Sequence, residues 1–451
     1  MTLPDTWRIV SYNTMLHISP AGKDGFANAR RAQLIGAAGF LHDANVVVLQ
    51  GLFETAGSRS LLRALARRGF THQSPAVSRP DASRRVSGTP GGGMYDSSVG
   101  GGTAVVSRHP ITRAEEHLFP EPPRARNGMS NGFTYAAVRT GSGTLHLIDT
   151  HLYSGQDHEA QRIREDQLAR LAHYLAEREE DGTLPPEDTV AVAGTLNVPC
   201  GSGEFTRMLA TLHAEQPTAK TGWPYSLDTT NNTIARRRHA RPSGPPRRPA
   251  QDLDHVLLRR GHARPSKWNS RVLVSRTPWT AGTRHYTDYS DHQPVLAGAC
   301  ITSRPGRYDL CLTAIRLATH PTTTGPPAPY GTVTVTTDTG GPHTVWECAL
   351  PRPHSHRPGA NLLSHPLLFP AASSFALQTD LLHRSPAPRG RHRTLAYGTV
   401  WWQAGARLGS HAVPVEGHHG RATLSFTTRV ATAGPGPARP STAEVQPGEA
   451  P

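Results

Sequence analysis

The sequence predicts an α/β domain with layered helices and sheets, followed by an all-β sandwich. Up to about residue 300, apolar strand-like runs are interleaved with amphipathic helical patterns, without strict alternation of strand and helix. Beyond residue 307 the helical pattern disappears, and runs rich in β-branched and aromatic residues are separated by loops of Pro, Gly and His. The 451 residues of the chain are enough for two such domains.

Hydrophobic periodicity defines the elements of the first domain. Residues 28–42 and 159–180 are predicted helices, because apolar side chains recur along one face of each at helical spacing. Short apolar runs are predicted strands, at residues 7–12, 45–49, 103–107, 145–150, 189–193, 254–258 and 294–299.

The domain boundaries follow changes in composition. We place the α/β domain at residues 1–300, a linker at 301–307 and the β-sandwich at 308–432. The Pro- and Gly-rich residues 433–451 are predicted to be a disordered tail. Strands of the sandwich are predicted at residues 307–319, 330–338, 343–350, 373–383, 394–405 and 421–432.

The chain is strongly basic. Its formal net charge is +14 and its isoelectric point is near 10.2. Such a charge balance favours anionic partners, namely nucleic acid, phospholipid head groups or phosphate esters. A GC-rich genome, which encodes Arg more often than Lys, would give the same balance. The basic, proline-rich residues 236–248 are either a solvated insertion or a contact to an anionic surface.

Cysteine spacing and hydropathy exclude several classes of protein. The four cysteines are widely spaced and form no CxxC pair, so neither a zinc site nor a dense disulfide framework is predicted. A signal-peptide core and an apolar run of about 18 residues or more are both missing, so no membrane span is predicted. We expect a cytoplasmic protein, with export by another route left open.

Polar residues recur where apolar strands end, which is where catalytic groups often lie. Taken singly, each is weak, but six in one chain predict a common site. They are Tyr12-Asn13, Gln50-Gly51, Thr150-His151, Thr195 with Asn197, Asp254, and Ser290-Asp291-His292.

The stretches around these positions resemble the endonuclease/exonuclease/phosphatase superfamily, and in particular its bacterial sphingomyelinase C branch. The resemblance covers nearly all of residues 7–300. It rests on RIVSYNTML, ANVVVLQGLFETAGSRSLL, GGTAVVSRHPI, SNGFTY, IDTHL, LDTTNNTIAR, DLDHVLL and TDYSDHQPV, in the order of that branch. It implies a four-layer αββα sandwich that hydrolyses a phospholipid phosphodiester with water and a divalent cation such as magnesium.

The resemblance also implies roles in proton transfer. His292 resembles the general base that takes a proton from the attacking water. Asp254 resembles the carboxylate that orients and polarises this histidine, and Asp291 adjoins His292, so that one strand end presents both.

Three further residues are implied to bind the phosphate or a metal. His151 resembles the histidine that donates to the phosphate or stabilises the leaving oxygen. Asn13 and Asn197 resemble the amides that hold a metal ion or a phosphate oxygen. The implied chemistry is in-line attack of water on phosphorus, with charge developing on the phosphoryl oxygens.

Two departures from the family pattern concern the metal. Where the family reads LQE this chain reads Gln50-Gly51, and where it reads GDxN this chain has Thr195, so both expected carboxylates are replaced. Magnesium is usually held by one or two carboxylates, and losing one electrostatic stabiliser lowers a rate by about 10²–10³. Asp149 and Glu54 are candidate replacements, and an arginine acting in place of the ion is a third possibility.

A further departure concerns membranes. The branch places an exposed aromatic hairpin before the final SDH, but here PWTAGTRHYTDYSDH has Trp279 without a paired aromatic tip. Docking by this hairpin is therefore not expected. Phe375, Trp401 and Trp402 of the second domain either fill its core or supply a surface contact.

These observations leave three functional hypotheses. The first is a sphingomyelinase C-type phosphodiesterase acting on a phospholipid. The second is a pseudoenzyme, in which the same fold is kept as a module that binds phospholipid or a protein partner and holds no divalent cation. The third is a nuclease, which the net charge and residues 236–248 suggest and the motif spacing favours less.

Overall fold

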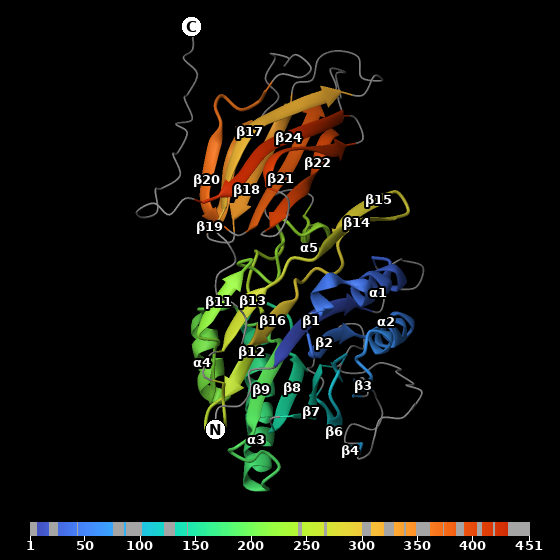
Figure 1. Cartoon of the computed structure of the whole chain (residues 1–451), viewed down its shortest axis with the longest axis vertical. Coiled ribbons are helices and arrows are strands. Elements are labelled where there is room, and N and C mark those ends of the chain that lie inside the picture. The colour runs from blue at the N-terminus through green and yellow to red at the C-terminus, as the bar shows by residue number, and fades with distance from the viewer. Residues whose placement is uncertain are drawn as a thin grey trace. The chain divides into compact units, whose positions relative to one another are not determined.

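In the computed structural model the chain divides into two units, residues 1–303 and 304–451 (Figure 1). The predicted linker at 301–307 and the predicted tail at 433–451 lie outside the residues that the structure describes. Those described are residues 7–17, 26–42, 44–74, 85–86, 102–120, 131–141, 143–241, 246–265, 268–299, 308–319, 329–337, 340–348, 361–372, 374–384, 392–403, 408–417 and 420–431.

Two seven-stranded sheets form the centre of the first unit. The first sheet has, in spatial order, β11 (Ala219–Gly222), β13 (Asn269–Val272), β16 (Val295–Gly298), β1 (Arg8–Leu16), β2 (Val46–Leu52), β5 (Ala104–Ser107) and β3 (His72–Gln73). The second has β10 (Ala214–Glu215), β12 (Asp254–Arg259), β9 (Thr189–Thr195), β8 (Gly143–His151), β7 (Gly132–Thr140), β6 (Ile111–Leu118) and β4 (Arg85–Val86).

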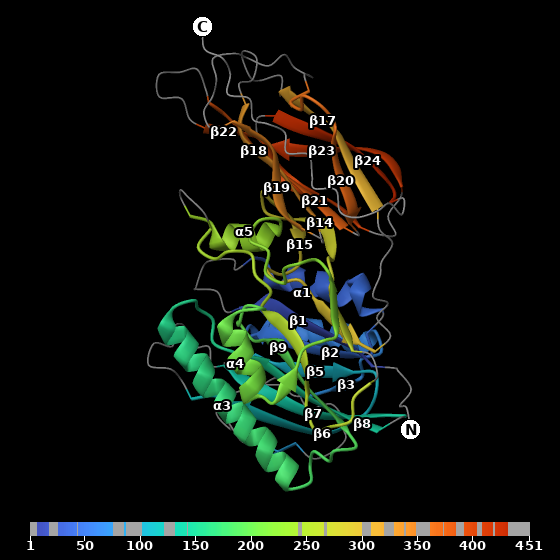
Figure 2. The same ribbon diagram turned by 90° about the vertical axis from the view of Figure 1, so that its left-hand side faces the viewer.

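Helices cover the outer face of each sheet. Helices α1 (Asn28–Ala37) and α2 (Thr55–Arg67) share an apolar cluster with β1 and β2. Helices α3 (His158–Glu180) and α4 (Gly203–Thr211) share another with β8 and β9, and Figure 2 shows α3 running beside the strands of that sheet. The order helix, sheet, sheet, helix confirms the predicted αββα sandwich.

Strand alternation sends polar side chains between the two sheets. In β1, Val10 and Tyr12 join the apolar cluster beneath the helices, so Ser11 and Asn13 point the other way. Asn13 meets Thr195 of β9 there, across the interface between the sheets. The polar residues at the strand ends therefore face one another rather than the helices.

The elements differ from the sequence prediction mainly at their ends. The predicted helix at 28–42 ends at Ala37, because Ala38 takes an extended conformation, and a 3-10 turn follows at Gly39–Leu41. The predicted strands of this unit are all present with slightly shifted bounds. A fifth helix, α5 (Thr233–His239), packs beside a two-stranded hairpin of β14 (Arg276–Ala281) and β15 (Arg284–Asp288).

The second unit is the predicted β-sandwich, built from two four-stranded sheets. One has β20 (Leu367–Ala372), β17 (Tyr308–Thr319), β24 (Gly420–Val430) and β23 (Gly409–Gly417), and the other has β19 (Gly340–Cys348), β18 (Pro329–Thr337), β21 (Ser374–Arg384) and β22 (His392–Gln403). Phe375 and Trp402 are buried in its core, as the first of the two interpretations held. The side chain of Trp401 is outside the described set.

Two cysteines and the helices of the described residues can be assigned. Cys200 and Cys311 are free thiols, and Cys300 is not among the residues described. Within the described ranges, the helices fall short of the length and apolarity that crossing a membrane requires.

Gly194 of β9 lies so close to the backbone of β8 that a side chain there would destabilise the fold. A Cβ at Gly194 would lie 2.0 Å from the carbonyl oxygen of Thr150, and the residue has a φ of 136°. We expect Gly194→Ala to lower the free energy of unfolding by about 3 kcal/mol or more, measured by urea denaturation of the full chain.

Gly182→Ala is the matched control for this prediction. Gly182 also has a left-handed φ, of 73°, but a Cβ added there would have no heavy atom within 4 Å. Its substitution should therefore lower the free energy of unfolding by about 1–2 kcal/mol, the backbone contribution alone. Equal losses in the two variants would contradict a steric role for Gly194.

Candidate active site

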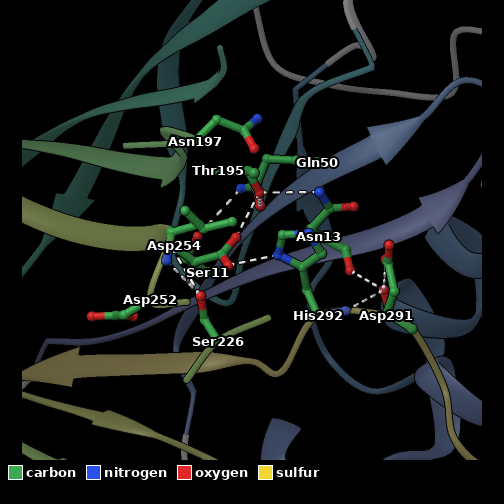
Figure 3. Close-up of polar contacts among 12 residues, drawn as sticks. Ser11, Asn13, Gln50, Thr195, Asn197, Ser226, Asp252, Asp254, Asp291 and His292 are labelled. Atoms are coloured by element: carbon green, nitrogen blue, oxygen red, sulfur yellow. Dashed lines mark hydrogen bonds and ion pairs between the residues drawn. The ribbon is translucent and has the colours of Figure 1, made fainter. Parts of the chain in front are cut away.

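The register of the strands gathers the predicted site residues. In the second sheet, Thr195 at the end of β9 lies directly opposite Asp254 of β12 and His151 of β8. In the first sheet, Asn13 of β1 pairs with Gln50 of β2. Because the two sheets pack face to face, the ends of these five strands form one polar cluster, of which Figure 3 labels Asn13, Gln50, Thr195 and Asp254.

His292 and Asp254 form a buried ion-paired dyad. Asp254 Oδ2 lies 2.6 Å from His292 Nδ1, and the two side chains are 1 % and 6 % exposed. Burial alone would lower the pKa of His292, but the negative charges of Asp254 and Asp291 outweigh it and raise that pKa. With Nδ1 bonded to the carboxylate, Nε2 is the nitrogen that remains to accept a proton.

Thr195 satisfies the other oxygen of Asp254. Its Oγ1 donates to Asp254 Oδ1 at 2.6 Å and accepts from Asn13 Nδ2 at 3.2 Å. Burial would raise the pKa of Asp254, but the charge and hydrogen bond of His292, with hydroxyl bonds from Ser226 and Thr195, hold it below its ordinary value. A neutral hydroxyl thus lies where a second carboxylate would repel Asp254.

The residues around Asn13 do not fit a divalent cation. Gly51 has no side chain and a φ of 74°, and a Cβ there would lie 2.7 Å from Asn13 Oδ1. That Oδ1 already accepts from Met15 N at 3.0 Å, while Nδ2 points at Thr195. Across the described ranges, no group of three His, Cys, Asp or Glu side chains is placed to hold a metal ion. Neutral groups therefore stand where magnesium would need carboxylates.

Neither candidate replacement carboxylate serves the site. Asp149 is fully buried and its Oδ1 accepts from Gln50 Nε2 at 2.6 Å, so Gln50 separates it from Thr195. Burial raises the pKa of Asp149 well above its ordinary value. Glu54 caps helix α2, accepting from the backbone amides of Ala56 and Gly57. Both candidate replacements, Asp149 and Glu54, are therefore engaged by partners of their own.

His151 lies beside Thr195 as a neutral imidazole. Burial, together with the charge of His292, lowers its pKa to about 4. Its Nδ1 is buried and has no hydrogen-bond partner in the described part of the chain. At neutral pH such a ring can donate or accept a hydrogen bond, but it carries no charge.

Asn197 is held by its neighbours rather than left open to a metal. It has a left-handed φ of 54°, and its Nδ2 donates to the carbonyl oxygen of Leu152 at 2.9 Å. Its Oδ1 accepts from Arg248 Nη2 at 3.1 Å. The predicted metal-binding or phosphate-binding amide is thus already bound to a guanidinium group.

Asp291 belongs to an ion pair with Arg238 rather than to the proton transfer itself. Burial would raise its pKa, but Arg238 and the neighbouring histidines hold the pKa of this carboxyl well below its usual range. Its permanent negative charge helps to raise the pKa of His292.

Sequence reasoning missed the arginines of the site. Arg238 ends helix α5 and Arg248 follows it in the chain, so both come from the basic residues 236–248. The positive charge of this segment could have drawn attention to it. The sequence pattern does not show which of its basic residues point into the protein. His17 and Ser226 were missed as well, because neither stands in a strand-end motif.

A buried arginine ties the parts of the site together. The guanidinium of Arg31 donates to the carbonyl oxygens of Met15 at 2.5 Å and Tyr289 at 3.0 Å, from two segments far apart in the chain. Ser290 Oγ donates to the carbonyl oxygen of Asn13 at 2.6 Å. These bonds fix the segment that carries His292 against the end of β1.

The β14–β15 hairpin has a polar tip. Trp279 stacks on Tyr286 with ring centroids 4.6 Å apart, and both are buried. The exposed tip residues are Gly282–His285. As the sequence indicated, this hairpin presents no paired aromatic side chains for insertion into a lipid surface.

Comparisons with known proteins agree with this geometry. The model of the Endonuclease/Exonuclease/phosphatase family matches residues 21–292. Sphingomyelinase C of Listeria ivanovii is 28 % identical over 65 % of this chain and 86 % of the relative, and that of Bacillus cereus is 29 % identical over 65 % and 88 %. The predicted resemblance to the sphingomyelinase C branch is confirmed.

Solved structures show the same relation for the first unit. Sphingomyelinase C from Streptomyces griseocarneus is 33 % identical, with a TM-score of 0.55, over 66 % of this chain and 99 % of that one. A variant of beta toxin from Staphylococcus aureus with bound magnesium ions is 25 % identical, with a TM-score of 0.55, over 66 % of this chain and 100 % of that one.

The dyad generates a prediction about the titration of His292. We expect its pKa above the ordinary 6.5 in the wild type, and lower by about one unit or more in Asp254→Asn, because burial and the charge of Arg248 then act with less opposition. Protonated His292 stabilises the fold below about pH 6.5, a contribution lost as pH rises through the raised pKa. Imidazole NMR titration, with His292→Gln for assignment, measures the shift.

The control for this titration is Asp181→Asn. Asp181 pairs with Arg178 on helix α3 and is 42 % exposed. Its substitution should leave the His292 resonance unchanged. A His292 pKa that is the same in Asp254→Asn as in the wild type would contradict the role given to Asp254.

Proposed function

The chain belongs to the endonuclease/exonuclease/phosphatase family, and on that premise we propose that it hydrolyses a phosphodiester with His292 as general base. One observation carries the proposal: His292 is buried, oriented by Asp254 at 2.6 Å, and raised in pKa. Because Asp254 holds Nδ1, the other ring nitrogen is free to take a proton from water, as a general base must. Its position at the strand ends agrees with the family's catalytic site.

The proposed step balances as a hydrolysis. Nε2 of His292 takes a proton from water while the water oxygen forms a bond to phosphorus. The bond from phosphorus to the alcohol oxygen breaks, and that oxygen takes a proton, giving an alcohol and a phosphomonoester. Asp254 stabilises the imidazolium that forms, and neutral His151 is placed to hydrogen-bond a phosphoryl oxygen.

A phospholipid is the proposed class of substrate. The support is that relatives named sphingomyelinase C and phospholipase C match most of the first unit. The polar tip of the β14–β15 hairpin argues against deep insertion of this unit into a bilayer. We therefore propose that substrate is cleaved most readily when its phosphate is accessible from water, as in mixed micelles.

A binding module without turnover is the second candidate. Gly51 and Thr195 favour it, because the described residues present no carboxylates where the family would hold its ion. The nuclease hypothesis is weaker, because it rested partly on the basic residues 236–248 as a surface for nucleic acid. Arg238 and Arg248 of the basic segment turn toward Asp291 and Asn197, instead of forming an open surface stripe.

Hydrolysis of sphingomyelin in detergent micelles and of bis(p-nitrophenyl) phosphate tests the proposal, each with magnesium and with EDTA. Product release by the wild type should fall about 10²–10⁴-fold in His292→Ala, because the base that activates water is removed. His173→Ala is the control, since His173 is 76 % exposed on helix α3.

Two results would contradict the hydrolase. Release at the same rate by wild type and His292→Ala would place the chemistry elsewhere. No release by the wild type from either substrate, at any pH between 6 and 9, would favour the binding module, which then should retain affinity for the micelles.

A further inference from the structure

We propose that Arg238 and Arg248 form a pair that binds the phosphate group of a phosphate ester beside His292 without a divalent cation. The ligand class is a phosphomonoester or phosphodiester anion. The identity of the ligand rests on the proposed function. The experiment that tests the inference measures phosphate binding rather than turnover.

Arg248 forms no direct ion pair with a described residue. Among the residues that the structure describes, its guanidinium contacts no carboxylate, and its one hydrogen bond is to the neutral amide of Asn197. Its Nε is buried and makes no hydrogen bond to any described residue. Burial and the positive charge of Arg164 lower its pKa to about 10, while the charges of Asp291 and Asp254 act in the opposite direction. A buried donor without a partner is costly, and an anion bound beside Arg248 would satisfy it.

Arg238 contributes a second, more accessible guanidinium. Its Nη1 pairs with Asp291 while its side chain is 38 % exposed, so part of the group faces solvent. The charges of Arg238 and Asp291 both act on Arg248, so the two guanidinium groups are near enough to influence each other. Paired guanidinium groups match the oxygens of a phosphate, as arginine forks do elsewhere.

The segments that carry the arginines are anchored to the catalytic strand. Gln251, three residues after Arg248, pairs with Leu227, and Leu227 also pairs with His292. Asn232, the N-cap of helix α5, donates to the carbonyl oxygen of Ser290 at 2.9 Å. Both arginines are therefore held at fixed positions relative to His292 rather than on a free loop.

The residues that surround the dyad on its inner side are mostly neutral. Thr195 places a hydroxyl, not a carboxylate, against Asp254, and Asp149 is kept behind Gln50 with its pKa raised by burial. The negative charges that remain, on Asp254 and Asp291, are already paired with His292 and Arg238, and the two further carboxylates that a divalent cation would offset are missing. An anionic phosphate beside Arg248 meets little repulsion, so the cationic part of the site comes from side chains.

Titration of the full chain with inorganic phosphate in EDTA, by calorimetry and by thermal shift, tests the inference. The wild type should bind phosphate and gain thermal stability from it. Arg248→Gln should raise the Kd at least about tenfold, because a charge-assisted hydrogen bond is lost, and Arg248→Lys should fall between them. Arg238→Gln should also raise the Kd for phosphate.

Arg207→Gln is the control, because Arg207 is 56 % exposed on helix α4 and pairs with Glu165. The thermal shift also distinguishes a loss of binding from a loss of folding. Without phosphate, Arg248→Gln should melt close to the control, since Arg248 forms no direct ion pair with a described residue. Phosphate binding by Arg248→Gln equal to the wild type, or by the wild type only with magnesium, would overturn the inference.

The outcomes remain distinct from those of the proposed function. Arginine-dependent phosphate binding without hydrolysis supports this inference and contradicts the hydrolase. Hydrolysis that depends on His292 while phosphate binding is insensitive to both arginines supports the hydrolase and contradicts this inference.

Discussion

The hydrogen bond from Thr195 to Asp254 is the interaction on which the rest of the site depends. At 2.6 Å, Thr195 Oγ1 satisfies the carboxylate oxygen that His292 leaves free. A carboxylate at this position would need a cation between itself and Asp254, because two like charges at hydrogen-bond distance cannot both be ionised without one. The hydroxyl makes the dyad complete without an ion, and it links the dyad to Asn13.

The fold was largely predictable because it rests on periodicity. Short apolar runs gave the strands, and in the structure the alternation of side chains along them brings Asn13 and Thr195 together on facing inner surfaces. The proton-transfer pair was also predictable, since Asp254 and His292 stand in recognisable motifs and meet as expected. Helix α2 was not predicted, so the sequence did not show that Glu54 is its N-cap.

Long-range contacts explain what the sequence could not predict. The role of Asp149 depended on Gln50, which reaches it from another sheet, and strand alternation alone could not show that contact. The basic segment 236–248 was recognisable by its charge, yet only its anchoring to Ser290 and Leu227 turns two of its arginines inward. Of the three alternatives left open in the sequence, arginine in place of the ion is the one that we propose, because Arg238 and Arg248 contact Asp291 and Asn197.

The central claim is that the proton-transfer half of this site is intact while its charge for phosphate comes from arginine rather than from magnesium. Calorimetric titration of the EDTA-treated full chain with magnesium chloride tests it most directly. The account predicts no saturable binding that differs between the wild type and Asn13→Ala, because Asn13 Oδ1 is bound to the Met15 amide. Stoichiometric magnesium binding by the wild type that Asn13→Ala abolishes would contradict it.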